Sequence, residues 1–110
     1  MNFISLSQNN NEQVSRIINA NSWSNCLAYL EGTGENILQI YKIEDSTLIV
    51  LNSPQSTNCY NILLQDTSSQ ENYNYIVFEN NYNDLNNWIS QQTGKTLVSF
   101  QLSEKSYVTV

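Results

Sequence analysis

The sequence contains no histidine, one proline, three glycines, two cysteines and only four basic residues among its 110 positions. The lack of histidine removes the commonest general base and the commonest transition-metal ligand of proteins. It also excludes Ser–His and Cys–His nucleophile pairs, which leaves only the rarer lysine-assisted variants. We therefore expect a protein that is not an enzyme and that has no cofactor and no metal site.

Positive charge is scarce, and this limits the classes of partner. Ten acidic residues against four basic ones give a net charge of −6, and the basic residues lie far apart in the sequence, at Arg16, Lys42, Lys95 and Lys105. Binding a phosphate backbone or an anionic membrane surface needs a basic stripe. We expect no nucleic-acid binding and no membrane binding, so the expected partner is another protein.

Long apolar runs are also missing. The longest uninterrupted run covers residues 48–51, whereas a membrane-spanning helix needs about 20 residues. The first residues lack the basic and long apolar regions of a signal peptide. Cys26 and Cys59 are too few for a disulfide scaffold, so we expect free, buried thiols in a reducing cytoplasm, with a Cys26–Cys59 disulfide as the less favoured alternative.

The length of the chain predicts one domain over residues 1–110. Hydrophobic residues make up 40% of the chain, and they follow regular patterns, which favours a folded domain over a disordered one. No internal repeat is visible in the sequence. The few glycines include two Gly-containing motifs, at 32–34 and 93–96, but neither has the spacing and the following helix that a phosphate loop requires.

The clearest pattern runs from residue 73 to residue 102. Residues 73–79 alternate as a strand does, residues 81–94 change to helical spacing, and residues 95–102 alternate again. Asn81 is a suitable helix N-cap, and Gly94 suits a left-handed helix exit. The predicted helix places its apolar residues on one face, and the following strand places its apolar residues on one side; these are Leu85, Trp88 and Ile89, and Val98, Phe100 and Leu102.

The patterns in the rest of the chain are less clear. Helical spacing predicts a helix over about 12–20. Residues 23–31 fit either a helix or the first arm of a hairpin that turns at 32–34, and we favour the hairpin because strands are predicted to follow it. Further strands are expected at 36–44, 47–51, 59–65 and 107–110, with a loop at 52–58. The predicted fold is α+β with two layers: a mainly antiparallel sheet of five to seven strands with two helices packed on one face.

Residues 72–83 are unusually rich in Tyr and Asn. Tyrosine combines a large apolar ring with a polar tip, a combination that binding surfaces use. If Ile76 faces the helices, Tyr73 and Tyr75 lie on the open face of the sheet, and Tyr82 lies at the start of the helix. These three tyrosines are our candidate protein-binding residues. The alternative is that they are ordinary half-buried strand residues.

Two classes of function remain. We favour a small, acidic, non-enzymatic interaction domain of inhibitor, immunity or adaptor type that binds another protein through this uncharged Tyr/Asn-rich surface. The alternative is a structural or assembly subunit, for example a virion component, that forms homo-oligomers through the same surface. Small acidic Asn-rich domains are often carried by phages or mobile elements, which is an association and not a deduction from these residues.

Overall fold

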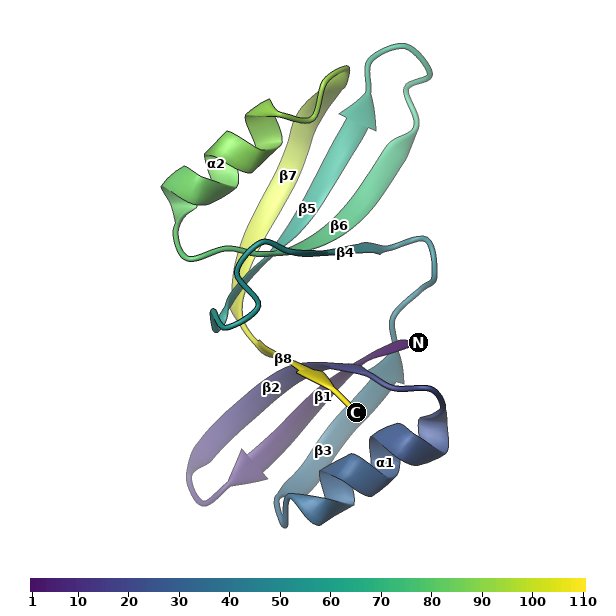
Figure 1. Ribbon diagram of the computed structural model, residues 1–110, viewed down its shortest axis with the longest axis vertical. Coiled ribbons are helices and arrows are strands. Elements are labelled where there is room, and N and C mark those ends of the chain that lie inside the picture. The colour runs from purple at the N-terminus through teal and green to yellow at the C-terminus, as the bar shows by residue number, and fades with distance from the viewer. The chain divides into compact units, whose positions relative to one another are not determined.

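The computed structural model describes residues 1–110 as eight strands and two helices (Figure 1). In chain order these are β1 (Asn2–Asn9), β2 (Glu12–Asn19), α1 (Trp23–Gly32), β3 (Asn36–Lys42), β4 (Leu48–Leu51), β5 (Asn58–Asp66), β6 (Asn72–Phe78), α2 (Tyr82–Ser90), β7 (Lys95–Glu104) and β8 (Ser106–Thr109). The strands form two four-stranded mixed sheets. The predicted α+β class is confirmed, but the predicted single sheet of five to seven mainly antiparallel strands, with both helices on one face, is replaced by two sheets that each have their own helix.

The chain divides into two compact units, and each unit has its own sheet and helix. The first unit is Met1–Glu44 together with Lys105–Val110, and the second is Asp45–Glu104. The strand order is β3-β1-β2-β8 in the first unit and β4-β6-β5-β7 in the second. Neither helix is long and apolar enough to cross a membrane. A single domain over residues 1–110 stays a prediction.

The predicted helix at 12–20 is strand β2. Asn9 pairs with Glu12, so Asn10 and Asn11 form a two-residue hairpin turn between β1 and β2. Asn10 has a φ of 57°, a left-handed conformation that asparagine tolerates better than most residues. The β-branched residues of this segment then pair with β1 along its length. The asparagines therefore start a hairpin instead of capping a helix.

Residues 23–32 form helix α1, so the favoured hairpin is wrong. Ser22 caps the helix, because its side-chain oxygen accepts a hydrogen bond of 3.1 Å from the Asn25 amide. Cys26 and Leu30, one helical turn apart, are fully buried against Phe3 and other apolar residues of the sheet. Burial of this face on the sheet selects the helix over the hairpin.

The second unit follows the clearest sequence pattern. Asn81 caps α2 by accepting a hydrogen bond of 2.9 Å from the Asp84 amide, and Gly94 has a φ of 77° after the helix. Leu85 is fully buried, and Trp88 and Ile89 pack against the same core. The predicted strand–helix–strand order of residues 73–102 is therefore confirmed.

The two units repeat one arrangement, which the sequence did not reveal. In each, a hairpin is followed by a helix and a third strand that pairs with the first, as β3-β1-β2 and as β7-β5-β6. The third strands carry a one-residue bulge at matching places, Leu38 in β3 and Val98 in β7. Both helices are capped by a side-chain oxygen, from Ser22 and Asn81. The protein thus contains two copies of a strand–strand–helix–strand segment.

The fourth strand of each sheet comes from the chain that follows the other segment. β4 comes after β3 in the chain but pairs in parallel with β6 of the second unit. β8 comes after β7 but pairs in parallel with β2 of the first unit. Each unit therefore receives its last strand by exchange. These two pairings are parallel, and the other four strand pairs are antiparallel.

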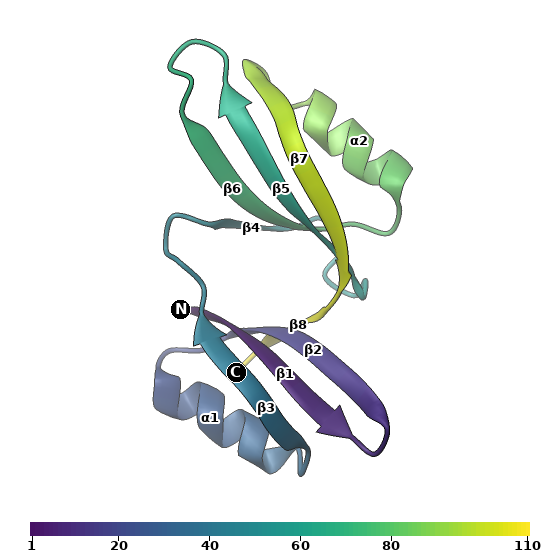
Figure 2. The same ribbon diagram turned by 180° about the vertical axis from the view of Figure 1, so that it is seen from behind.

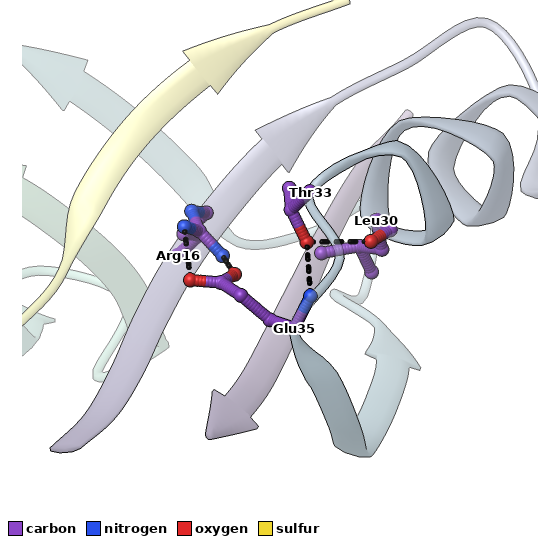
Figure 3. Close-up of polar contacts among 4 residues, drawn as sticks. All are labelled: Arg16, Leu30, Thr33 and Glu35. Carbon is purple, nitrogen blue, oxygen red and sulfur yellow. Dashed lines mark hydrogen bonds and ion pairs between the residues drawn. The ribbon is translucent and has the colours of Figure 1, made fainter. Parts of the chain in front are cut away.

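A partly buried ion pair in the first unit joins Arg16 of β2 to Glu35, which precedes β3 (Figure 3). Arg16 donates two hydrogen bonds to the Glu35 carboxylate, of 2.6 and 3.1 Å, and only 14% and 7% of the two side chains is exposed. Thr33 holds the segment that carries Glu35, because its hydroxyl donates to the Leu30 carbonyl and accepts from the Glu35 amide. The hydrogen bonds from Arg16 lower the pKa of Glu35.

The two units differ in what they bury beneath the helix. Ser5 and Ser7 of β1 are fully buried, and their hydroxyls have no hydrogen-bond partner. Ile62 and Leu64 of β5 lie at the matching positions, since Ser7 and Leu64 both directly follow the register shift. A buried, unpaired hydroxyl costs about 1–3 kcal/mol. The first unit therefore has the more polar interior beneath its helix.

We expect Glu35→Gln to lower the free energy of unfolding by about 1–2 kcal/mol at neutral pH, because it leaves the partly buried Arg16 charge without its hydrogen-bonded counter-ion. The folded pKa of Glu35 is lowered, so its contribution is present above the unfolded value of about 4.3 and is lost as the pH falls through the folded value. Urea unfolding followed by circular dichroism at pH 7 and pH 3 should therefore show a smaller difference from wild type in acid.

Glu31→Gln is the matched control, because Glu31 lies in the same region of the chain but is exposed. It should change stability by less than about 0.5 kcal/mol. Equal losses for the two variants would contradict a stabilising role for the ion pair.

Candidate interaction surface

No three His, Cys, Asp or Glu side chains group as metal ligands would. Cys26 and Cys59 are buried, as expected, and are not joined in a disulfide; burial raises the pKa of the Cys26 thiol. A raised pKa keeps a thiol protonated and unreactive.

A shallow polar hollow lies where β6 leads into α2, and it contains two carboxylates. Glu79 is buried and accepts a hydrogen bond of 2.8 Å from the Asn52 side chain, while its carbonyl accepts one of 3.0 Å from the Ser56 hydroxyl. Asp84 lies in the first turn of α2, where a carboxylate is stabilised by free amides. Glu79 holds the 52–58 loop and Asp84 complements the helix, so both acids have structural partners.

The structure separates the three candidate tyrosines. Tyr75 is buried in the core, with its ring edge-on to Trp88 at a centroid distance of 5.3 Å. Tyr73 packs against the same core, donates a hydrogen bond of 3.1 Å to Glu71 and lies beneath the Lys95 ammonium. Tyr82 is 52% exposed at the start of α2.

The expected orientation of Tyr73 and Tyr75 is therefore wrong. They pair across the sheet with Leu64 and Ile62, whose side chains belong to the core beneath α2. Directly opposed residues of antiparallel strands share a face, so both tyrosines point toward the helix, and Ile76 points the other way. A one-residue difference in register exchanges the two faces of a strand. Tyr82 alone remains an accessible candidate.

The accessible apolar residues gather on strand β7 instead. β7 is ten residues long and is the outermost strand of its sheet, with α2 beside it (Figure 2). All its residues are exposed except Lys95 and Ser103, which are partly exposed. Phe100 contacts Tyr82, with ring centroids 5.6 Å apart. We call this region the β7 edge surface; it consists of Tyr82, Leu97, Val98, Phe100 and Leu102.

The bulge decides which β7 side chains lie together. Because Val98 is the extra residue, Leu97 faces the same side as Phe100 and Leu102, opposite residues of the core beneath α2. Alternation in the sequence had placed Val98, and not Leu97, on the same side as Phe100 and Leu102. The adjacent apolar pair Leu97-Val98 breaks strict alternation and was the available sign of a bulge.

The charges of this surface lie at its two ends. Lys95 begins β7 and Glu104 ends it, and residues 96–103 between them are uncharged. Lys95 lies 5.2 Å from the centre of the Tyr73 ring, which places its ammonium on the α2 side of the sheet. The middle of the strand thus carries no charge that would oppose docking of another strand.

The other outer strands offer less backbone for pairing. β4 and β8 have four residues each, and β3 has seven. Short outer strands and charged outer residues are common protection against unwanted strand pairing. β7 is the longest unpaired sheet edge of the protein and has no proline within it.

Comparison with family models, with curated proteins and with solved structures finds no match to this chain. Its function is therefore argued from the geometry of its own surfaces.

We expect Tyr75→Ala to lower the free energy of unfolding by about 3 kcal/mol, because it leaves a cavity beside Trp88. Tyr82→Ala removes an exposed ring and should cost less than about 1 kcal/mol. Urea unfolding of the two variants measures both values. Similar losses would show that the two rings are equally buried, contrary to the structure.

Proposed function

We propose that this chain is a non-enzymatic protein-interaction domain, of inhibitor, immunity or adaptor type, which binds an extended segment of its partner along the β7 edge surface. The observation that carries the proposal is a ten-residue outer strand with unpaired backbone groups and exposed apolar side chains. An added strand satisfies such backbone groups, and pockets for alternate side chains give specificity.

The side chains of β7 suit protein contact. Phe100 and Tyr82 supply aromatic area, and Leu97 and Leu102 flank them on the α2 side. Aromatic residues are enriched, and charged ones depleted, at the centres of protein interfaces. A contiguous apolar patch on a small protein is itself an indication of a contact surface.

The chemistry of the chain supports binding over catalysis. The sequence has no imidazole, and its four basic residues do not form the stripe that a nucleic acid requires. The two free, buried thiols suit a reducing compartment, so we propose a cytoplasmic location. No cofactor enters this proposal.

A second candidate is an assembly subunit that associates with its own copies through the same strand. It is favoured by the opposite charges at the ends of β7, Lys95 and Glu104. Both candidates use one surface, and they differ in the identity of the added strand.

We expect the double variant Phe100→Lys/Leu102→Lys to lose its partner in affinity capture from the source cell, because lysines on an outer strand oppose strand addition. Its matched control is Leu38→Lys/Tyr41→Lys on β3, where both residues are exposed to a similar degree. Circular dichroism should show that both variants stay folded.

Hydrogen exchange of the captured complex gives a second readout. In the wild-type complex the backbone amides of β7 should exchange more slowly than in the unbound chain, and the backbone amides of β3 should exchange at the same rate as in the unbound chain. Capture that survives the β7 variant and fails with the β3 variant would place the contact on the first unit instead.

A further inference from the structure

We infer that β7 pairs with β7 of a second copy of this chain, antiparallel and about a two-fold axis at Phe100, so that the sheets of the two second units join into one. The inference rests on the proposed function of β7 as a strand that accepts another strand. It identifies the partner strand as β7 of a second copy, and it predicts which residues of the two strands lie opposite each other.

The register follows from the bulge. With Phe100 opposite Phe100 of the second copy, Ser99 lies opposite Gln101 of that copy. Val98 is an extra residue in β7, so the pairing shifts by one beyond it and places Leu97 opposite Leu102. In this register apolar residues therefore lie opposite apolar residues on the α2 side of the sheet, and polar residues lie opposite polar residues on the other side.

The same register pairs the charges. Beyond Leu97 it places Lys95 of one copy opposite Glu104 of the other, and the symmetry makes this contact twice. Both residues lie on the α2 side of the sheet. Lys95 is two residues from Leu97, and Glu104 is two residues from Leu102, and both leucines pair with core residues of β5 beneath α2. Opposite charges directly across an antiparallel pair stabilise it.

This charge arrangement matters because two copies each carry a net charge of −6 and repel each other at long range. Acidic neighbours are close: Asp66 is the residue paired with Lys95 on β5, and Glu71 binds the Tyr73 hydroxyl beneath that lysine. Lys95 is the only basic residue of the second unit. Its place directly opposite an acid of the second copy is therefore the selective feature.

Strand β3, which occupies the same position in the first unit, lacks this complementarity. Its bulge at Leu38 defines the matching register, with Ile40 on the axis. In that register Lys42 lies opposite Ile37, and no acid opposes the lysine. Two strands with the same geometry thus differ in self-complementarity, and only β7 has it.

The antiparallel order of β7 also keeps both α2 helices on one side of the joined sheet, since a two-fold axis perpendicular to a sheet does not exchange its faces. Tyr82 and Phe100 of each copy then lie near the axis, because the axis passes between the two Phe100 residues and each Phe100 contacts Tyr82. Pairing of the two strands covers part of the exposed area of Leu97, Phe100 and Leu102, which are 40%, 44% and 51% exposed in the single chain.

The test is a charge exchange on the full chain, read by light scattering and by sedimentation over a dilution series. Lys95→Glu and Glu104→Lys should each weaken the dimer about tenfold, because each variant turns both contacts into like-charge pairs. The double variant Lys95→Glu/Glu104→Lys should restore wild-type dimerisation. An equimolar mixture of the two single variants should form a heterodimer, since each of its contacts then joins opposite charges.

Cross-linking tests the register itself. A mixture of Ser99→Cys and Gln101→Cys chains should form a disulfide-linked heterodimer under mild oxidation faster than either variant alone links to itself. The native cysteines, Cys26 and Cys59, are buried, so they do not compete. The matched control is a mixture of Gln39→Cys and Tyr41→Cys chains, which places the same pair on β3 and should not link.

The outcomes separate this inference from the proposed function. A chain that stays monomeric at all concentrations, while the β7 lysine variant still abolishes capture, overturns the second copy as partner and leaves the binding strand in place. A dimer that is indifferent to the charge exchange and to the β7 cysteines overturns the register. If the β7 variants still dimerise and still capture a partner, both the inferred dimer and the proposed binding strand are overturned.

Discussion

The structure depends on how the edges of two small sheets are closed. In each unit the third strand pairs with the first strand of the hairpin. The second hairpin strand, β2 or β6, would therefore be an open edge if no other strand paired with it. A parallel strand from another part of the chain, β8 or β4, pairs with it. Because exchange of these two strands closes one edge of each sheet, the third strands β3 and β7 remain as the only long open edges. The surfaces available for strand addition are thus set by which edges the chain itself closes.

The repeated segments have kept their backbone and changed their interiors. The second unit buries Ile62 and Leu64 where the first buries two unpaired serine hydroxyls. Replacing a buried ion pair by apolar residues of similar volume is often neutral or stabilising, so Arg16 and Glu35 are not required for a core of this shape. The common features are the ones that backbone geometry demands: a polar cap before each helix and a bulge in each third strand. Pairing geometry constrains the fold here more strongly than the identity of the buried side chains.

Local sequence patterns predicted the structure correctly where no long-range pairing favoured a different one. Asn81 caps a helix whose apolar residues share one face, as predicted, although the helix ends at Ser90 with Gln91 as its C-cap, before the left-handed Gly94. Residues 12–19 failed because Val and Ile fit both helical spacing and a strand, and the choice was made by a two-residue turn and by pairing with β1. Residues 23–32 failed in the opposite sense, since burial of Cys26 and Leu30 against the sheet selected the helix. Tyr75 was assigned to the wrong face because alternation gives two equivalent faces and does not say which one is covered.

The sequence by itself determined the α+β class, the second helix with its N-cap Asn81, and the scarcity of positive charge. These follow from side-chain chemistry and from contacts between residues close in the chain, which act before any tertiary structure forms. The tertiary structure alone decided the repeat, the exchanged parallel strands, the face of each tyrosine and the open edge at β7. All of these depend on pairing between residues far apart in the sequence, and a strand of alternating side chains carries no local information about its neighbour.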